Sequence, residues 1–375
     1  MKSRLLLLAL LLLPGIGLWM TPASAIAQTL PAAASLTDGW NAIATDGVCS
    51  SGTPYQFYAR NGISDDLLIY FNGGGACWFG QACDLNSQPN VHFPFAEMEQ
   101  NNPAMGHGVF ALDNPENPFR DYDMVVITYC TGDVHIGAGE KFYTYTNAEG
   151  GEVTVNTFHN GYANSTRVLD WTYENYADPG KVVIAGSSAG AIGASFYSGF
   201  VAERYPDSPV TLIADAAGGY NSPNLQVTFN AWNTAAILPP WPDYAGKTND
   251  NLTFEDFYIA SSRHAPNLTI AQYNAAEDVT QVQFSLLIGD RIGSFSLPQR
   301  IFNHYVEIES AVDSFHHYTA GGNVHTILVS PIFYTYEVTG VRFVDWVKAL
   351  VEGNPMGDIS CVNEPDGCSG APAGD

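Results

Sequence analysis

The stretch Lys181–Gly190 reads KVVIAGSSAG, and the fold of the whole chain is organised around it. Its first part, Lys181–Ala185, is apolar and rich in β-branched residues, which predicts a short buried strand. Its second part, Gly186–Gly190, fits the pattern G-x-S-x-G, and the small apolar residues of Ala191–Phe200 predict a packed helix. A strand, a tight turn and a helix are the context of a nucleophile elbow with Ser188 at its apex. A plain Gly/Ser turn is the alternative interpretation.

In a nucleophile elbow, small residues in the turn are required by the close packing of strand and helix. Gly186 and Gly190 let the strand and the helix approach closely, and Ser188 sits at a strained backbone position that only small neighbours permit. The N-terminus of the helix then presents backbone N–H groups to a developing negative charge.

The N-terminus has the features of a secretory signal peptide. Lys2 and Arg4 precede a leucine-rich run, Leu5–Leu13, and small residues follow up to the expected cleavage point near Ala25 or Ala27. The apolar run is too short for a comfortable membrane span, and no later stretch is long enough for one. We therefore expect a secreted or periplasmic protein that has no membrane partner once the signal peptide is removed.

Composition predicts one domain with an acidic surface. Residues 1–25 form the expected signal peptide, and residues 26–375 contain no linker, repeat or charge block that would divide them. The formal net charge is −24, and loss of the signal peptide leaves 12 basic against 38 acidic residues, a net charge of −26. Such a surface repels nucleic acid, and it disfavours a strongly anionic polymer as substrate unless its charges are masked.

The six cysteines predict disulfides rather than a metal site, because their number is even and the chain is exported. Pairing Cys77–Cys83 and Cys361–Cys368 would close small loops, which leaves Cys49–Cys130 as the third bridge. No C-x-x-C motif is present, so we expect no zinc.

Two further loops follow apolar strands. The strand expected at Asp66–Phe71 runs into the glycine triplet of Asn72–Trp78, which predicts an oxyanion loop of the kind found in lipases and esterases, with a flexible turn as the alternative. The strand expected at Asp123–Tyr129 is followed by Asp133 and His135. These two residues are candidates for substrate binding, and a structural turn beside a disulfide explains them equally well.

The remaining pattern predicts an α/β-hydrolase-like, doubly wound and mostly parallel sheet with helices on both faces. The segment 222–253, rich in aromatic residues and proline, is expected to form a lid-like insertion or a cleft wall. Two segments, 38–51 and 84–118, are expected to be irregular. Further strands are expected at 55–60, 209–214 and 268–273, and helices at 159–176, 297–312 and 341–351.

A serine nucleophile needs a base, and in α/β hydrolases the acid and the histidine follow the serine in that order. This order disfavours four of the nine histidines, namely His92, His107, His135 and His159. Of the others, His304 fits a helix face, and His316 and His317 point to opposite faces of an extended segment, so that one of them suits a structural role. His325 lies in a late Gly-Gly-Asn-Val-His-Thr turn and is the favoured base; His264 is the other histidine that this order leaves.

Three aspartates lie between this serine and His325. Asp215 follows the strand next after the elbow, which is early for the acid, and Asp290 sits in a polar Gly-Asp-Arg turn where Arg291 offers it a partner. Asp278 follows a buried strand and precedes His325 by 47 residues, so it is the favoured acid; its neighbour Glu277 is the local competitor.

Together these stretches resemble the pectin acetylesterase family of Notum-like serine carboxylesterases. The resemblance implies Ser188 as nucleophile, Asp278 as acid and His325 as base, with oxyanion donors at the backbone of Gly74, Gly75 and Ala189 and no cofactor. It also supports the pairs Cys77–Cys83 and Cys49–Cys130. The matching stretches are CSSGTPYQFYAR (Cys49–Arg60), LLIYFNGGGACW (Leu67–Trp78), VVITYCTGDVHIG (Val125–Gly137), GSSAGAIG (Gly186–Gly193), NAAEDVTQ (Asn274–Gln281) and NVHTIL (Asn323–Leu328).

Two positions depart from the family pattern, because Ala76 and Ala191 stand where relatives carry an aromatic residue and a second glycine. These departures concern the pocket rather than the chemistry. The expected function is a secreted serine carboxylesterase that removes O-acetyl groups from a polysaccharide such as pectin. The alternatives are an esterase for lipid-like acyl groups or a polyester, and a carbohydrate-binding protein without activity. The sequence predicts no oligomeric state.

Overall fold

A computed structural model describes residues 29–88, 90–363 and 368 of this chain. The predicted signal peptide, residues 1–25, lies outside the described residues. No helix in the part of the chain that the structure describes is long and apolar enough to cross a membrane.

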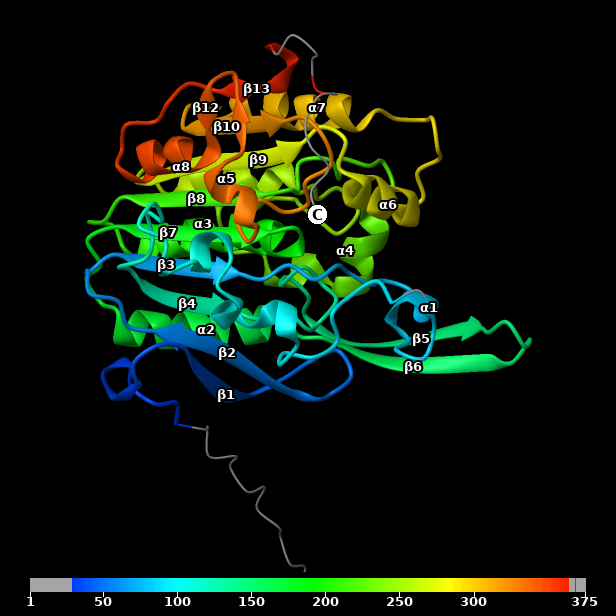
Figure 1. The fold of residues 1–375 in the computed structure, drawn as a ribbon. Coiled ribbons are helices and arrows are strands. Elements are labelled where there is room, and N and C mark those ends of the chain that lie inside the picture. Colours follow the sequence, from blue (N-terminus) through cyan, green and yellow to red (C-terminus); the bar gives the residue numbers. More distant parts are fainter. Residues whose placement is uncertain (1–28, 89, 364–367, 369–375) are drawn as a thin grey trace, which may run out of the picture.

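Nine strands of the described chain form one twisted sheet (Figure 1). From β3 outward to β13 all neighbours run parallel, and antiparallel β2 and β1 extend the other edge beyond β4. The predicted mostly parallel sheet is confirmed. In spatial order the strands are β1 (Asn41–Val48), β2 (Pro54–Arg60), β4 (Asp123–Ile127), β3 (Leu67–Phe71), β7 (Val182–Ser187), β8 (Val210–Asp215), β9 (Leu268–Ala275), β10 (Phe315–Ala320) and β13 (Ile359–Ser360).

The central strands are apolar along their whole length because both faces of the sheet are covered. In β3, for example, Leu67, Ile69 and Phe71 face one apolar core, and Leu68 and Tyr70 face a second core on the opposite side. A continuous apolar run, rather than an alternating one, is what such a strand requires.

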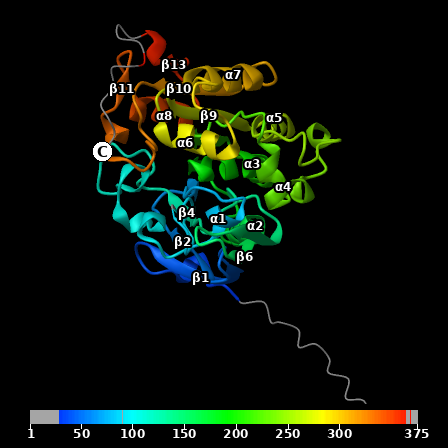
Figure 2. The ribbon, with the colours of Figure 1, turned by 90° about the vertical axis from the view of Figure 1, so that its right-hand side faces the viewer.

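Helices cover both faces, as predicted. One core is closed by α2, α3, α5 and α7, and the other by α8 together with short 3-10 turns; Figure 2 shows α3 and α5 on one side of the sheet and α8 on the other. The α-helices are α1 (Gly80–Cys83), α2 (Gly161–Asn175), α3 (Ala189–Arg204), α4 (Gln226–Trp232), α5 (Glu255–His264), α6 (Val279–Ile288), α7 (Leu297–Glu309) and α8 (Phe343–Val351). The 3-10 helices span Ala33–Ser35, Glu99–Asn101, Pro103–Met105, Gly108–Phe110, Thr234–Ile237, Pro242–Tyr244, Pro331–Tyr334 and Cys361–Asn363.

Two local expectations are wrong, and one element was not predicted. The entry segment 38–51 is not irregular, because it contains β1, which pairs with β2. The element without a prediction is the hairpin of β5 (Gly139–Thr146) and β6 (Glu152–His159), which extends from the body and is largely exposed (Figure 1), so it lacks the apolar runs of a buried strand. The last helix does not close the fold, since β13 follows it and joins the sheet edge. A further pair of two-residue strands, β11 (Glu337–Val338) and β12 (Val341–Arg342), precedes α8.

The disulfides form as predicted: Cys49–Cys130, Cys77–Cys83 and Cys361–Cys368. Cys49–Cys130 joins the segment after β1 to the segment after β4, and Cys77–Cys83 closes the short loop between the glycine triplet and α1. The aromatic residues of segment 222–253 are mostly buried, with Trp232 and Trp241 in the core on the α3 face, so this segment is a packed wall built around α4.

Candidate active site

The predicted strand, turn and helix are all present around Ser188. β7 ends at Ser187, α3 begins at Ala189, and Ser188 between them has φ 55° and ψ −122°, a conformation that side chains rarely adopt. The glycines make this turn possible: a Cβ atom added at Gly186 would lie 2.2 Å from the carbonyl oxygen of Gly190. The strain is therefore held by close packing between strand and helix, as in a nucleophile elbow.

Ser188, His325 and Asp278 form one hydrogen-bonded series. Asp278 Oδ2 lies 2.6 Å from His325 Nδ1, and His325 Nε2 lies 2.9 Å from Ser188 Oγ. A carboxylate can only accept, so Nδ1 carries the ring proton and Nε2 is free to accept the hydroxyl proton of the serine. All three side chains lie at the carboxyl edge of the sheet, on the loops after β7, β9 and β10. This is the geometry of a nucleophile, a base and an orienting acid.

Asp278 also begins a helix. Its Oδ1 accepts the backbone N–H groups of Thr280 and Gln281, at 2.9 and 3.0 Å, as the N-cap of α6. The Gln281 amide donates to Asp278 Oδ2 at 3.0 Å and to Asn274 Oδ1 at 3.2 Å. Gln281 is a residue of this site that was not predicted, although Asp278-Val-Thr-Gln281 has the spacing of a capping box, which is the signal that the sequence offers.

The glycine loop after β3 faces the elbow. Gly74 and Gly75 have φ values of 154° and 73°, and a Cβ atom at Gly75 would lie 2.0 Å from Val91 O, so the loop requires glycine. Among the described residues none accepts a hydrogen bond from the backbone N–H of Gly74, Gly75 or Ala189. These are the three N–H groups that the sequence assigns to an oxyanion, and they are free to receive one.

Asp133 and His135 do not face the cleft. Both are buried, with exposed fractions of 0% and 2%, and neither lines the pocket or the cleft beside Ser188. Asp133 accepts hydrogen bonds from Thr131 Oγ1 (2.6 Å) and Gly161 N (2.8 Å), while His135 Nε2 donates to the carbonyl of Asn72 at 2.8 Å. Burial lowers the pKa of His135 to about 4, so the ring is neutral. The substrate-binding interpretation is therefore replaced by the structural one. His135 holds the carbonyl of Asn72, just before the glycine triplet, and Asp133 holds the turn around Thr131, His135 and Gly161.

The other candidate acids do not form a hydrogen bond with the His325 ring. Asp290 pairs with Arg300 at 2.6 Å, rather than with the neighbouring Arg291. Glu277 is exposed. Asp215 is fully buried but contacts the loop after His325 rather than its ring.

Three of the other late histidines, His264, His304 and His317, have structural partners. His304 is buried in α7 and forms a 2.6 Å pair with Glu255 of α5. His317 stacks on the ring of Tyr305 with 4.2 Å between the centroids, and His264 stacks on Trp241.

Two groups of potential metal ligands gather in the described residues. One is Cys77, Cys83 and His159, in which the sulfurs are joined as a disulfide. The other is Glu309, His317 and Asp358, at the far edge of the sheet. Neither includes a residue of the series around Ser188.

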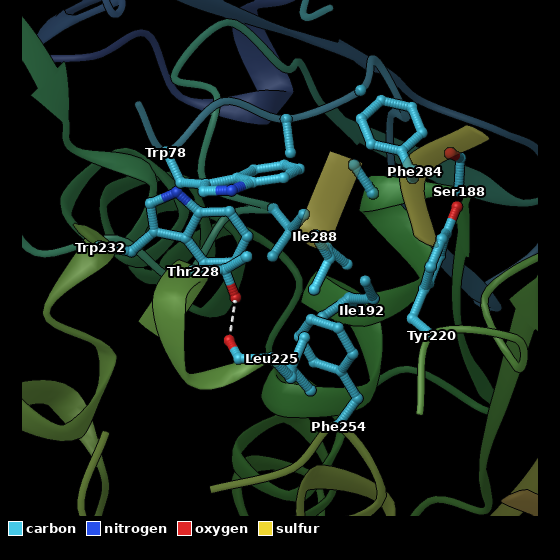
Figure 3. A pocket seen from close by; sticks show the side chains of 14 residues that line it. Trp78, Ser188, Ile192, Tyr220, Leu225, Thr228, Trp232, Phe254, Phe284 and Ile288 are labelled. Carbon is cyan, nitrogen blue, oxygen red and sulfur yellow. Dashed lines mark hydrogen bonds between the residues drawn. The ribbon is translucent and has the colours of Figure 1, made fainter. Parts of the chain in front are cut away.

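An apolar pocket opens beside Ser188 (Figure 3). Its empty space, with the open mouth included, is about 370 Å³. Tyr220, on the turn after β8, points its hydroxyl toward the Ser188 side chain. The apolar walls come from the glycine loop, α3, α4 and α6, namely Trp78, Ile192, Leu225, Trp232, Phe254, Phe284 and Ile288.

A wider cleft lies on the other side of the serine. It is lined by the glycine loop, segment 90–100, α6 and the His325 loop. Its described lining residues include no Lys, Arg, Asp or Glu. The acidic surface of the protein therefore does not extend into this cleft, and the cleft is not basic either.

The parallel sheet, the elbow and the loops at its carboxyl edge define the class of the α/β hydrolases. A family model described as Pectinacetylesterase matches residues 31–232, more than half of the chain. The chain belongs to this family of carboxylic ester hydrolases, as the resemblance indicated. The matched segment contains the glycine loop and Ser188, whereas Asp278 and His325 lie beyond it, so their assignment depends on the geometry above.

The chain is also similar to two curated carboxylesterases. It is 28% identical over 150 residues to the palmitoleoyl-protein carboxylesterase NOTUM of Schmidtea mediterranea, covering 39% of this chain and 26% of that protein. It is 25% identical over 179 residues to the NOTUM protein of Homo sapiens, covering 46% of this chain and 34% of the human protein. The match thus spans about a third or less of these relatives.

Proposed function

We propose that this protein is a serine carboxylesterase that removes O-acetyl or other short acyl groups from a polysaccharide through an acyl-enzyme. The observation that carries the proposal is the hydrogen-bonded series of Ser188, His325 and Asp278, which lies across from a glycine loop with free N–H groups. Acyl transfer needs a nucleophile, a base held in the correct tautomer, and donors for the oxyanion.

In the first half of the reaction Ser188 Oγ attacks the ester carbonyl while His325 Nε2 takes the hydroxyl proton. Asp278 holds the ring through Nδ1 and stabilises its charged form. The carbonyl oxygen becomes an oxyanion, and the N–H groups of Gly74 or Gly75 and of Ala189 receive it, each donor contributing about 3–4 kcal/mol. The C–O bond to the alcohol then breaks, and His325 gives its proton to the departing oxygen.

In the second half a water molecule gives a proton to His325 Nε2 and attacks the acyl-enzyme. The same N–H groups hold the second oxyanion. Collapse breaks the bond to Ser188 Oγ, which recovers its proton from His325, and the carboxylic acid leaves. The proposed steps use only the chain's own residues, the ester and water.

The two spaces beside Ser188 suit the two parts of an ester. The apolar pocket, bounded by Ala189 and Ile192, would take the acyl group, and the open cleft would take the alcohol. A cleft without charged side chains favours a neutral sugar chain, or a pectin whose carboxylates are methylated, over bare polygalacturonate.

We further propose that residues 26–375 act as one secreted or periplasmic domain. The support is the sequence of the first 25 residues, together with three disulfides, which are typical of oxidising compartments. A single sheet that runs from β1 to β13 supports the one-domain interpretation.

The central test compares the wild type with Ser188→Ala on p-nitrophenyl acetate and on acetylated xylan, methylated acetyl-pectin and demethylated acetyl-pectin, with acetate release as readout. We expect hydrolysis by the wild type only, with demethylated pectin the poorest polymer. Full activity of Ser188→Ala would contradict the mechanism. Failure of a fluorophosphonate probe to label Ser188 would instead favour a carbohydrate-binding protein without activity.

A second candidate is an esterase for longer, lipid-like acyl groups or a polyester. The observation that favours it is the apolar lining of the pocket by Trp78, Trp232 and Phe254. Initial rates on p-nitrophenyl esters from C2 to C16 distinguish the two. Rates that fall steadily beyond C2 to C4 support the acetyl assignment, whereas a maximum at C8 or above supports the lipid-like substrate.

A further inference from the structure

A second buried carboxylate lies behind the proposed catalytic series. Asp215 is the last residue of β8, the strand beside the elbow strand, and its exposed fraction is 0%. Its Oδ2 accepts hydrogen bonds from Ser187 Oγ at 2.9 Å and from Leu328 N at 2.8 Å. Its Oδ1 accepts from Ile327 N at 3.3 Å. The mechanism above does not use this side chain.

The same residue holds the nucleophile's backbone. The carbonyl oxygen of Asp215 accepts the N–H of Ser188 at 2.7 Å. One residue thus contacts the elbow through its main chain and the loop that follows His325 through its side chain. Ile327 and Leu328 lie 112 and 113 residues from Asp215 in the chain, and Ser187 lies 28 residues from it. Only the tertiary structure brings these groups together.

We propose that Asp215 is a positioning residue that fixes His325 relative to Ser188 by anchoring the loop at Ile327 and Leu328. The proposal rests on the roles proposed above for Ser188 and His325. In this arrangement Asp278 orients the imidazole ring, and Asp215 sets where the backbone that carries the ring lies.

A carboxylate is needed because three donors converge on it. An asparagine at this position would offer one oxygen, and its NH₂ group would face an N–H or O–H group that also donates. The donors are themselves fixed: Tyr70 of β3 contacts Ser187 Oγ at 2.6 Å, and since Ser187 donates to Asp215, the phenol donates to Ser187. Loss of the carboxylate would free the loop, and a displacement of about 1 Å near the reacting atoms can cost on the order of 10²-fold in rate.

The arrangement also has a pH signature. Burial raises the pKa of Asp215 to about 6, against the opposing effects of the Leu328, Ser187 and Ile327 donors and of His325. The other titratable groups that face it are Tyr70 and Tyr273, and their pKa values are raised by burial and by the Asp215 charge, so both stay neutral. Below about pH 6 the carboxyl takes up a proton and can no longer accept from all three donors.

The experiment compares Asp215→Asn with Asp133→Asn, a matched control. Asp133 is equally buried, also accepts three hydrogen bonds, and burial likewise raises its pKa to about 6, but it does not contact the His325 loop. Both variants lose a buried carboxylate, so a general cost to folding affects them alike. The readouts are kcat and KM on p-nitrophenyl acetate from pH 4.5 to 8, at temperatures where circular dichroism shows each variant folded.

For Asp215→Asn we expect kcat to fall by about 10²-fold with little change in KM. Protonation of Asp215 below about pH 6 should make the acid limb of kcat against pH steeper in the wild type than in Asp215→Asn. Asp133→Asn should keep the steep limb. A wild-type kcat in Asp215→Asn, an unchanged limb, or the same change in Asp133→Asn would each overturn the proposal.

If Asp215→Asn does not fold, Ser187→Ala takes its place. It removes one of the three donors, and we expect a fall in kcat of about fivefold at constant KM; an unchanged kcat overturns the proposal. Ser188→Ala, measured in parallel, separates the two levels of the argument. Activity in Ser188→Ala would refute the proposed function and the positioning role together, whereas an inactive Ser188→Ala beside an undiminished Asp215→Asn would refute the positioning role alone.

Discussion

Replacing Asp278 by asparagine should separate the two tasks of this side chain, because asparagine has only one carboxyl-type oxygen. In the wild type Oδ1 caps α6 at 2.9 and 3.0 Å, and Oδ2 receives His325 Nδ1 at 2.6 Å. If the asparagine oxygen keeps the cap, its NH₂ group faces Nδ1 and donates to it. The imidazole then carries its proton on Nε2 and cannot accept from Ser188.

The expected loss of activity is large. Removing the acid while keeping the geometry of a serine, histidine and aspartate series lowers kcat by about 10⁴ through the wrong tautomer. Asparagine is as good an N-cap as aspartate, so α6 keeps its cap, and the free energy of unfolding should fall only by about 1 kcal/mol, because the NH₂ group also faces the donating amide of Gln281. Asp278→Ala should lose the same activity and, in addition, about 1 kcal/mol of stability, because nothing caps α6.

The assay is kcat on p-nitrophenyl acetate beside chemical unfolding of the same preparations. Asp290→Asn and Glu277→Gln are the matched controls, since both residues are acidic neighbours in the sequence that the structure keeps away from the ring. The reasoning would be refuted if Asp278→Asn kept more than about a tenth of the wild-type kcat, or if either control lost as much as Asp278→Asn.

Three further predictions concern the surroundings of the site. Gly75→Ala should lower kcat by on the order of 10²–10³-fold, measured on p-nitrophenyl acetate, because the added Cβ would lie 2.0 Å from Val91 O and displace an oxyanion donor. Burial raises the pKa of Asp133 from 3.8 to about 6, so its contribution to stability is fully present below pH 3.8 and is lost as the pH rises through 6. In denaturant unfolding from pH 4 to 7, the free energy of unfolding of the wild type minus that of Asp133→Asn should fall by about 3 kcal/mol, and a difference that does not change with pH would contradict this. Replacing Cys49 and Cys130 together by alanine should cost about 4–5 kcal/mol in unfolding free energy, since this bridge spans 81 residues; a loss below about 1 kcal/mol would argue against the chain-entropy estimate.

The elbow could be predicted because its signals are local. An apolar strand, two glycines at fixed spacing and a small-residue helix lie within Lys181–Phe200, and the structure has each of them in place. The glycine triplet after β3 is equally local. The hairpin of β5 and β6 escaped prediction for the opposite reason: most of its residues are exposed, so no apolar period marks it.

Asp133 and His135 show where local reasoning misleads. Both follow a strand at the edge where sites form, and only the packing around them shows that both side chains are buried and that His135 holds the carbonyl of Asn72. Asp215 is the opposite case, a residue whose role the sequence did not reveal. Its position in the chain is early for the acid, and nothing in the sequence indicates that it anchors the loop of His325.

Short windows of sequence are enough to predict the class of fold, the place of Ser188 in a strained turn, the glycine loop and the order in which acid and base must follow. These depend on backbone preferences and apolar periods within short windows of the chain. Three features follow only from the tertiary structure. One carboxylate, Asp278, contacts the histidine ring, another, Asp215, anchors the histidine loop, and the described lining of the cleft has no charged side chains. Those contacts join residues 47 to 137 positions apart, and only the packing of parallel strands brings their ends to one edge.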